Sequence, residues 1–246
     1  PELFAKFEEL QIGYVFYIGG NDSMDTVSKL SRYAASAGSD IRFIGEPKTV
    51  DNDLVLTDHT PGFGSAARYV ASTVREIVID ANVYEKKSVT IIEIMGRHAG
   101  YIALWCGIAN GAEDILLPER YDGNEQVLIN RIIENRKRGK KHHIIINAEG
   151  IGHSTSMAKR IEAATGIETR ATILGYMQRG GAPTCKDRVY ASIMGVKAVE
   201  LLCSGKSNRL VAYRDGDFVD FDIQEALNMR KDIPEDQFQI SKLLVR

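Results

Sequence analysis

The chain has 246 residues, of which 44% are hydrophobic, enough to build one large domain or two modest ones. Its 31 basic and 33 acidic residues give a formal charge of −2, so no overall basic field attracts nucleic acid. No apolar stretch of the sequence approaches the roughly 20 residues that span a bilayer. These numbers favour a globular protein that binds neither nucleic acid nor a membrane.

The three cysteines, Cys106, Cys185 and Cys203, are odd in number, widely spaced and form no CxxC pair. This pattern predicts neither a disulfide framework nor a zinc site, and it fits a reducing cytoplasm.

Short β-branched runs alternate with longer amphipathic runs. Residues 13–18 predict a buried strand, and the helix after it ends at Gly38. Further strands are expected at 41–44, 89–94, 114–117, 144–147 and 169–174, and helices at 62–81, 101–109, 125–138, 156–164 and 188–202. Residues 210–222 predict a hairpin that turns at Asp215-Gly216. This alternation predicts an α/β fold with parallel sheets covered by helices on both faces.

Polar or glycine-rich clusters follow five of the expected strands. In parallel sheets ligands bind beyond the carboxyl ends of the strands, so these clusters mark the expected site. Their sequences, in chain order, are GGNDS, PKTVDND, MGRHAG, AEG and GYMQRGG.

In PKTVDND, the side chains of Thr49, Asp51 and Asp53 recur at period two and share one face of an extended segment. Three such groups hold an alcohol, accept its proton and reach a metal ion, as phosphoryl transfer requires. A capped turn, in which Asp and Asn are common, explains the same residues about equally well.

GGNDS follows a strand and opens a helix, an arrangement that lets an anion approach the backbone at a helix N-terminus. An ordinary turn with a capping residue has the same composition. Asp22 is unusual in such a place, since its carboxylate repels a phosphate brought close to it.

Three arginines, Arg97, Arg170 and Arg179, are expected at or near the tips of different strands. Guanidinium groups suit phosphate oxygens, so their convergence on one edge of a sheet predicts an anion site. Glu149 also ends a strand and is expected to accept hydrogen bonds from sugar hydroxyls. No histidine spacing indicates a metal site, and His142-His143 is interpreted as structural.

These clusters, with ETRATILGYMQRGG and the DR at 187–188, occur in the order and spacing of the phosphofructokinases, which the chain resembles over essentially its whole length. The resemblance implies two Rossmann-like three-layer α/β domains with parallel sheets and the active site between them. Residues 1–63 with about 178–228 are expected to bind the phosphoryl donor, and about 64–177 with 229–246 fructose 6-phosphate.

The resemblance also implies residue roles. Asp51 is the general base that takes the proton of the 1-hydroxyl, and Thr49, Val50 and Asp53 lie beside the reacting groups. Arg170 reaches the substrate of a neighbouring subunit, which implies a homo-oligomer, a dimer or a tetramer. The other residues implied to bind the sugar phosphate are Met95, Gly96, Arg97, Glu149, Tyr176 and Arg179; Gly19, Gly20 and Ser23 are implied for the donor.

Two positions indicate which phosphoryl donor the protein uses. ATP-dependent members carry GGDGS and PGTIDND, whereas this chain has Asp22 and Lys48 in place of glycines, as in the pyrophosphate-dependent branch. A carboxylate about 4 Å from a nucleotide phosphate costs roughly 1 kcal/mol in water and about 4 at an effective dielectric of 20. Lys48 supplies a cation beside the transferred phosphate. Pyrophosphate is therefore the expected donor, with Mg²⁺ as cofactor.

The chain also departs from the family pattern. Asn21 replaces an aspartate associated with magnesium, so its predicted role as a metal ligand is weak. Ser88, next to Lys87, replaces an arginine, and Tyr176 replaces the histidine of ATP-dependent members. The glycine-rich GGxxPGxN donor loop and its strand do not occur in these residues. We therefore expect a fragment of a longer protein, with little activity by itself.

Two alternatives stay open at this stage. An ATP-dependent or mixed-donor phosphofructokinase is one, and a non-catalytic regulatory subunit that binds a sugar phosphate is the other.

Overall fold

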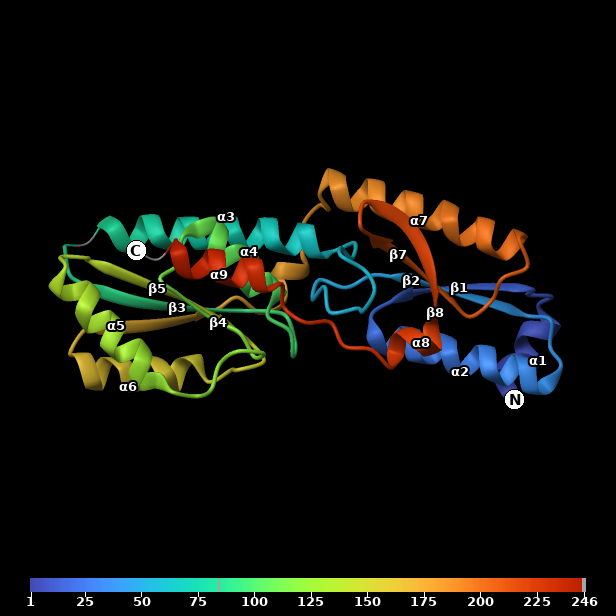
Figure 1. The fold of residues 1–246 in the computed structure, drawn as a ribbon, viewed down its shortest axis with the longest axis horizontal. Helices are drawn as coiled ribbons and strands as arrows, with labels where there is room; N and C mark the ends of the chain where they lie inside the picture. Colours follow the sequence, from blue (N-terminus) through green and yellow to red (C-terminus); the bar gives the residue numbers. More distant parts are fainter. Residues whose placement is uncertain (84, 245–246) are drawn as a thin grey trace. The chain divides into compact units, whose positions relative to one another are not determined.

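A computed structural model of the protein describes residues 1–83 and 85–244. These residues form two compact units, each an α/β layer structure of the kind that the resemblance implies (Figure 1). The last two residues of the expected sugar-phosphate domain, 245–246, lie outside the described residues. Unit 1 comprises Pro1–Thr49, Asp53–Gly64 and Pro183–Lys231, and unit 2 comprises Val50–Asn52, Ser65–Ala182 and Asp232–Arg246.

Unit 1 is built on a four-stranded sheet with the order β1-β2-β7-β8, in which only β8 is antiparallel to its neighbour. Its strands are β1 (Tyr14–Gly19), β2 (Arg42–Pro47), β7 (Arg209–Arg214) and β8 (Asp217–Asp222). Its helices are α1 (Glu2–Glu9), α2 (Asn21–Ala37), α7 (Cys185–Cys203) and α8 (Ile223–Leu227).

Side-chain alternation along the strands builds the two apolar layers of unit 1. Phe43 and Leu210 pack toward α2 and α8, while Ile44 packs toward α7. The helices accordingly lie on opposite faces of the sheet, with α2 and α8 on one face and α7 on the other (Figure 1). The sheet is thus sandwiched, and the loops at the carboxyl ends of β1 and β2 are held at one edge.

The expectation that the first strand is buried is wrong. Tyr14, Phe16, Tyr17 and Ile18 are all exposed. Within the part of the chain that the structure describes, β1 pairs only with β2 and therefore forms an edge of the sheet. Hydrophobic composition predicted the strand correctly but not the exposure of its side chains among the described residues.

Unit 2 contains an all-parallel sheet with the order β4-β5-β3-β6. Its strands are β3 (Ser88–Ile94), β4 (Asp114–Leu116), β5 (His142–Ala148) and β6 (Glu168–Ile173). Its helices are α3 (Phe63–Val83), α4 (Tyr101–Asn110), α5 (Glu125–Lys137), α6 (Ser154–Thr165) and α9 (Glu235–Leu243), with a short 3₁₀ helix, η1 (Gly175–Arg179).

The central strands of unit 2 are buried on both faces, as expected for a parallel sheet. Ile91 and Ile145 pack with Ile132 and Ile161, which come from α5 and α6 on one face. Helices α3, α4 and α9 lie over the opposite face (Figure 1). Among the described residues no helix combines the length and apolarity needed to cross a membrane.

Candidate active site

The segment that follows β2 lies only partly in an extended conformation. Pro47 ends the strand, and Thr49 forms an isolated parallel bridge with Gly62. The chain then bends at Val50 and Asp51, and Asn52 has a left-handed φ of 54°. The prediction that Thr49, Asp51 and Asp53 share one face of an extended segment is therefore wrong, because alternation does not continue through a left-handed residue.

The GGNDS loop lies directly against Lys48 and Thr49. The main-chain N–H of Lys48 donates to the carbonyl of Gly19 at 3.0 Å. A Cβ added to Gly20 would lie 3.7 Å from Cβ of Thr49, and one added to Gly19 would collide with Ser23 at 2.0 Å. The absence of a side chain at position 19 thus leaves room for Ser23 within the same loop.

Helix α2 begins at Asn21, and Gly20 is its N-cap. The anion-favouring end of a helix therefore opens at the predicted donor residues. Asp22 lies in the first turn and is exposed, so this helix end carries a carboxylate.

Asp53 is anchored within unit 1. Its Oδ2 accepts a hydrogen bond from Nδ2 of Asn21 at 2.8 Å. In this arrangement Asn21 orients a carboxylate, and its predicted contact with a metal stays a prediction. Lys231 also lies near this carboxylate: burial lowers the pKa of Lys231 to about 8, and the carboxylates of Asp58 and Asp53 offset part of that fall. No local pattern indicates Lys231, which lies 178 positions from Asp53 in the chain.

Unit 2 places a tight turn at the carboxyl end of β3. Gly96 has a φ of 151°, and Arg97 has a φ of 54°. Oε1 of Glu149 accepts the main-chain N–H groups of Gly96 at 3.2 Å and Arg97 at 2.6 Å. The predicted residues Gly96, Arg97 and Glu149 are therefore brought together, with the carboxylate shaping the turn that carries the arginine.

A buried glutamine, Gln178, holds the same region together and was missed by the sequence analysis. Its Oε1 accepts the N–H of Met95 at 3.0 Å, and its Nε2 donates to the carbonyl of Gly175 at 2.9 Å. Gln178 thereby joins the end of β3 to η1. Within η1 the guanidinium of Arg179 lies 5.1 Å from the ring centre of Tyr176. The conspicuous QRGG sequence was the available signal, and its glutamine received no role.

Arg170 does not join Arg97 and Arg179 at the carboxyl edge of the sheet, so the predicted convergence of three arginines is wrong. It is the third residue of β6 and pairs in register with Thr90, near the start of β3. Its Nε donates to Glu168 at 2.9 Å, and its side chain is 71% exposed. Its predicted role in a neighbouring subunit stays a prediction.

A magnesium ion needs few protein ligands, because it is usually held by one or two carboxylates together with substrate phosphates. The carboxylate of Asp53, beside the donor loop, provides a ligand of this type. Residues 1–83 and 85–244 contain no group of three His, Cys, Asp or Glu side chains that would form a complete metal cage. A single carboxylate such as that of Asp53 is the type of ligand used by a magnesium ion that is also bound by phosphate groups.

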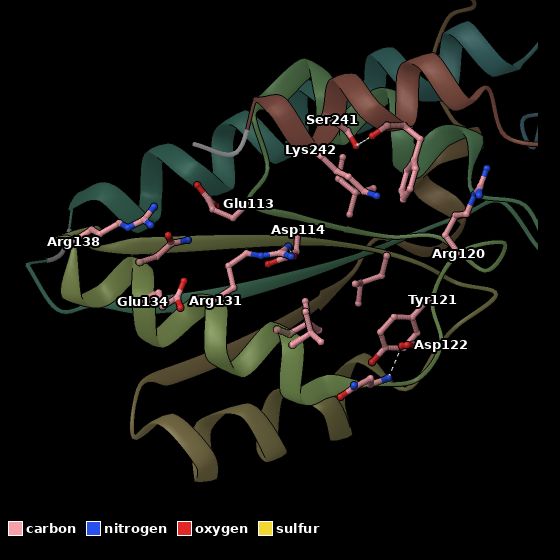
Figure 2. Close-up of a pocket in the computed structure, with 17 residues that line it drawn as sticks. Glu113, Asp114, Arg120, Tyr121, Asp122, Arg131, Glu134, Arg138, Ser241 and Lys242 are labelled. Atoms are coloured by element: carbon pink, nitrogen blue, oxygen red, sulfur yellow. Dashed lines mark hydrogen bonds and ion pairs between the residues drawn. The ribbon is translucent and has the colours of Figure 1, made fainter.

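A hollow of about 530 Å³ in unit 2 lies apart from the predicted residues, between α5, β4 and α9 (Figure 2). Asp114 and Arg131 point toward one another in it and form an ion pair. Asp114 also binds Nε2 of the buried His143 at 2.7 Å. This is the structural role expected for that histidine.

Comparison with known proteins shows whether the chain belongs to a specific family or has only a generic anion-binding fold. A family model described as Phosphofructokinase matches residues 1–202, most of the chain. The chain belongs to the phosphofructokinase family. An ATP-dependent 6-phosphofructokinase from Clostridium botulinum is 42% identical over 227 residues, which cover 92% of this chain and 68% of the relative. One from Clostridium acetobutylicum is 44% identical over 228 residues, with the same coverage.

Two solved structures of the family bear the other donor in their names. A pyrophosphate-dependent phosphofructokinase from Marinobacter aquaeolei matches with a TM-score of 0.85 and 31% identity, covering 97% of this chain and 69% of that one. Another, from Nitrosospira multiformis, matches with a TM-score of 0.87 and 27% identity. The match covers 99% of this chain and 70% of that one. The fold and family are thus confirmed, and the relatives divide over the donor.

Proposed function

We propose that the protein transfers a phosphoryl group from pyrophosphate to the 1-hydroxyl of fructose 6-phosphate, giving fructose 1,6-bisphosphate and orthophosphate. The hydroxyl oxygen attacks one phosphorus atom of pyrophosphate, and the bond from that phosphorus to the bridging oxygen breaks. Asp51 accepts the hydroxyl proton, which makes the oxygen a better nucleophile. We expect the reaction to be reversible, as the resemblance implies.

The sugar phosphate is assigned to unit 2. The turn at Gly96 and Arg97 presents main-chain and guanidinium groups, and Tyr176 with Arg179 adds a second cation at the ends of neighbouring strands. Guanidinium groups suit phosphate oxygens because their N–H donors form a planar fork. Glu149, already hydrogen-bonded to the turn, accepts from the sugar hydroxyls in this proposal.

The observation that carries the choice of donor is the pair of charged residues at the donor loop. The hydrogen bond from Lys48 to Gly19 holds Lys48 beside that loop, and Asp22 lies in the first turn of the helix that the loop opens. A nucleotide phosphate about 4 Å from the carboxylate is repelled by roughly 1 to 4 kcal/mol, depending on solvent access. The smaller pyrophosphate avoids this carboxylate and is stabilised by Lys48.

Magnesium and self-association complete the proposal. Asp53 would hold Mg²⁺ together with the donor phosphates, and the ion would neutralise phosphate charge. Asn21 fixes the orientation of Asp53. We further propose a homo-oligomer, a dimer or a tetramer, in which the exposed Arg170 serves a neighbouring subunit, and a cytoplasmic location.

ATP is the second candidate donor, because the curated relatives at 42% and 44% identity are named ATP-dependent. A side-by-side coupled assay of the full protein with Mg²⁺ and either donor separates the two. Pyrophosphate should support turnover and ATP hardly any; equal or faster turnover with ATP would overturn the choice. Asp22→Gly should raise the rate with ATP relative to pyrophosphate, whereas Asp25→Gly, three positions further along the same helix, should leave that ratio unchanged.

A further inference from the structure

Unit 1 contains a buried histidine–aspartate pair that the proposed chemistry does not use. Nε2 of His59 lies 2.7 Å from Oδ1 of Asp187, and each residue is only 3% exposed. The rings of Phe63 and Tyr190 stand edge-on to the imidazole, with centres at 5.6 and 5.3 Å. Because breaking such a bond leaves a buried polar group unsatisfied, this pair fixes its two segments firmly.

The backbone at Gly64 packs tightly against the His59–Asp187 pair. A Cβ added to Gly64 would lie 3.2 Å from Cε1 of His59 and 3.3 Å from Oδ1 of Asp187. The chain between Asp53 and Gly64 therefore folds back onto the two side chains. Asp187 itself lies in the first turn of α7, where its N–H donates to the Thr184 cap at 3.2 Å. The pair thus ties a loop to a helix.

The same loop holds the residues assigned to the donor. Oγ1 of Thr60, the neighbour of His59, donates to the carbonyl of Thr49 at 2.8 Å. Gly62 forms the parallel bridge with Thr49. On its other side the Lys48 N–H is bonded to Gly19. The Lys48–Thr49 peptide is therefore held between the donor loop and the segment that carries His59.

We propose that the His59–Asp187 pair is a positioning device, which anchors loop 53–64 to α7 and thereby fixes the Lys48–Thr49 peptide for phosphoryl transfer. The inference rests on the proposed function, since that function assigns Lys48 to the transferred phosphate. Displacement of a positioned group by about 1 Å is enough to lower a rate about 100-fold. Neither side chain touches substrate in this account; both act through Thr60 and Gly62.

The chain supplies its own matched control. His143 binds Asp114 at the same distance of 2.7 Å, is equally buried and lies in unit 2 outside the residues assigned to substrates. His59→Phe and His143→Phe both retain a ring and remove the N–H donor. His59→Gln retains a donor to Asp187 and tests for rescue.

The experiment combines hydrogen exchange with steady-state kinetics of the full protein. We expect His59→Phe to speed exchange in peptides that cover residues 48–62 and to lower kcat about 10- to 100-fold, with little change in KM for fructose 6-phosphate. His59→Gln should recover most of kcat. His143→Phe should lower the melting temperature while leaving exchange at 48–62 and kcat as in the wild type.

Three results would overturn the inference: unchanged exchange at 48–62 in His59→Phe, faster exchange there with unchanged kcat, or an equal loss of kcat in His143→Phe. Failure of the proposed function looks different, because the wild type itself would then transfer no phosphate from pyrophosphate. In that case calorimetry with pyrophosphate decides: weaker binding by His59→Phe alone supports the positioning role, and equal binding by all variants refutes it.

Discussion

The ammonium group of Lys231 should lose its proton at a lower pH than an ordinary lysine. Burial lowers its pKa from 10.5 to about 8, with Asp58 and Asp53 opposing the shift. Between these two values the unfolded chain keeps a proton that the folded chain has released. Stability contributed through Lys231 therefore rises with pH across the window from about 8 to 10.5 and is constant below it.

The size of the effect follows from the two pKa values. A shift of this size corresponds to about 3 kcal/mol over the whole window, and the part gained between pH 7 and pH 9 is about 1 kcal/mol. The change to make is Lys231→Met, which removes the titrating group. The unfolding free energies of wild type and variant are measured with urea at both pH values. The difference between them should shift in favour of the wild type by about 1 kcal/mol from pH 7 to pH 9.

The pKa of Lys231 can also be measured directly, alongside the unfolding experiments at pH 7 and pH 9. The lysine side-chain resonance that is missing in Lys231→Met should titrate near pH 8 in the folded wild type. Lys29→Met, which removes a solvent-exposed lysine paired with Asp25, serves as the control and should leave the stability difference the same at both pH values. A midpoint near 10, or a stability difference for Lys231→Met that is flat between pH 7 and pH 9, would refute the reasoning.

Three further predictions concern the assigned residues. Asp51→Asn should retain fructose 6-phosphate binding by calorimetry and lose about 100- to 10,000-fold in kcat; nearly intact turnover would show that the base is misassigned. Glu149→Gln should weaken the hydrogen bonds to Gly96 and Arg97, because a neutral acceptor replaces a charged one, and should raise KM for fructose 6-phosphate with a loss of about 1 kcal/mol in stability; an unchanged KM would argue against the assignment. Gly96→Ala places a Cβ 2.2 Å from the carbonyl oxygen of Ala99 at a φ of 151° and should cost more than about 2 kcal/mol; a wild-type melting temperature would contradict this.

Local sequence signals predicted much of the fold. Gly38 ends α2 in a left-handed conformation, and the hairpin of β7 and β8 turns at Asp215 and Gly216, both with positive φ. These signals work because each arises within a few residues of chain. Helices α1, α8 and α9 and the 3₁₀ helix η1 were not predicted; α8 and η1 are each only five residues long.

The parts of the site that sequence analysis missed depend on contacts between distant residues. His59 and Asp187 are 128 positions apart, and Gln178 lies 83 positions from Met95. No spacing rule links such residues before the fold brings them together. The period-two argument for Thr49, Asp51 and Asp53 failed for a local reason, the left-handed conformation of Asn52, which side-chain patterns do not report.

Among the described residues the second edge of β1 has no partner strand, which matters for how residues 1–246 behave when they are produced by themselves. The main-chain groups of that edge are available to another extended chain, and the exposed Phe16 and Ile18 add apolar surface on one face of the strand. Self-association should therefore increase with protein concentration and with salts that strengthen apolar association. A charged residue at position 16 would act as a gatekeeper against such strand addition, as lysine does on the exposed edges of many natural sheets.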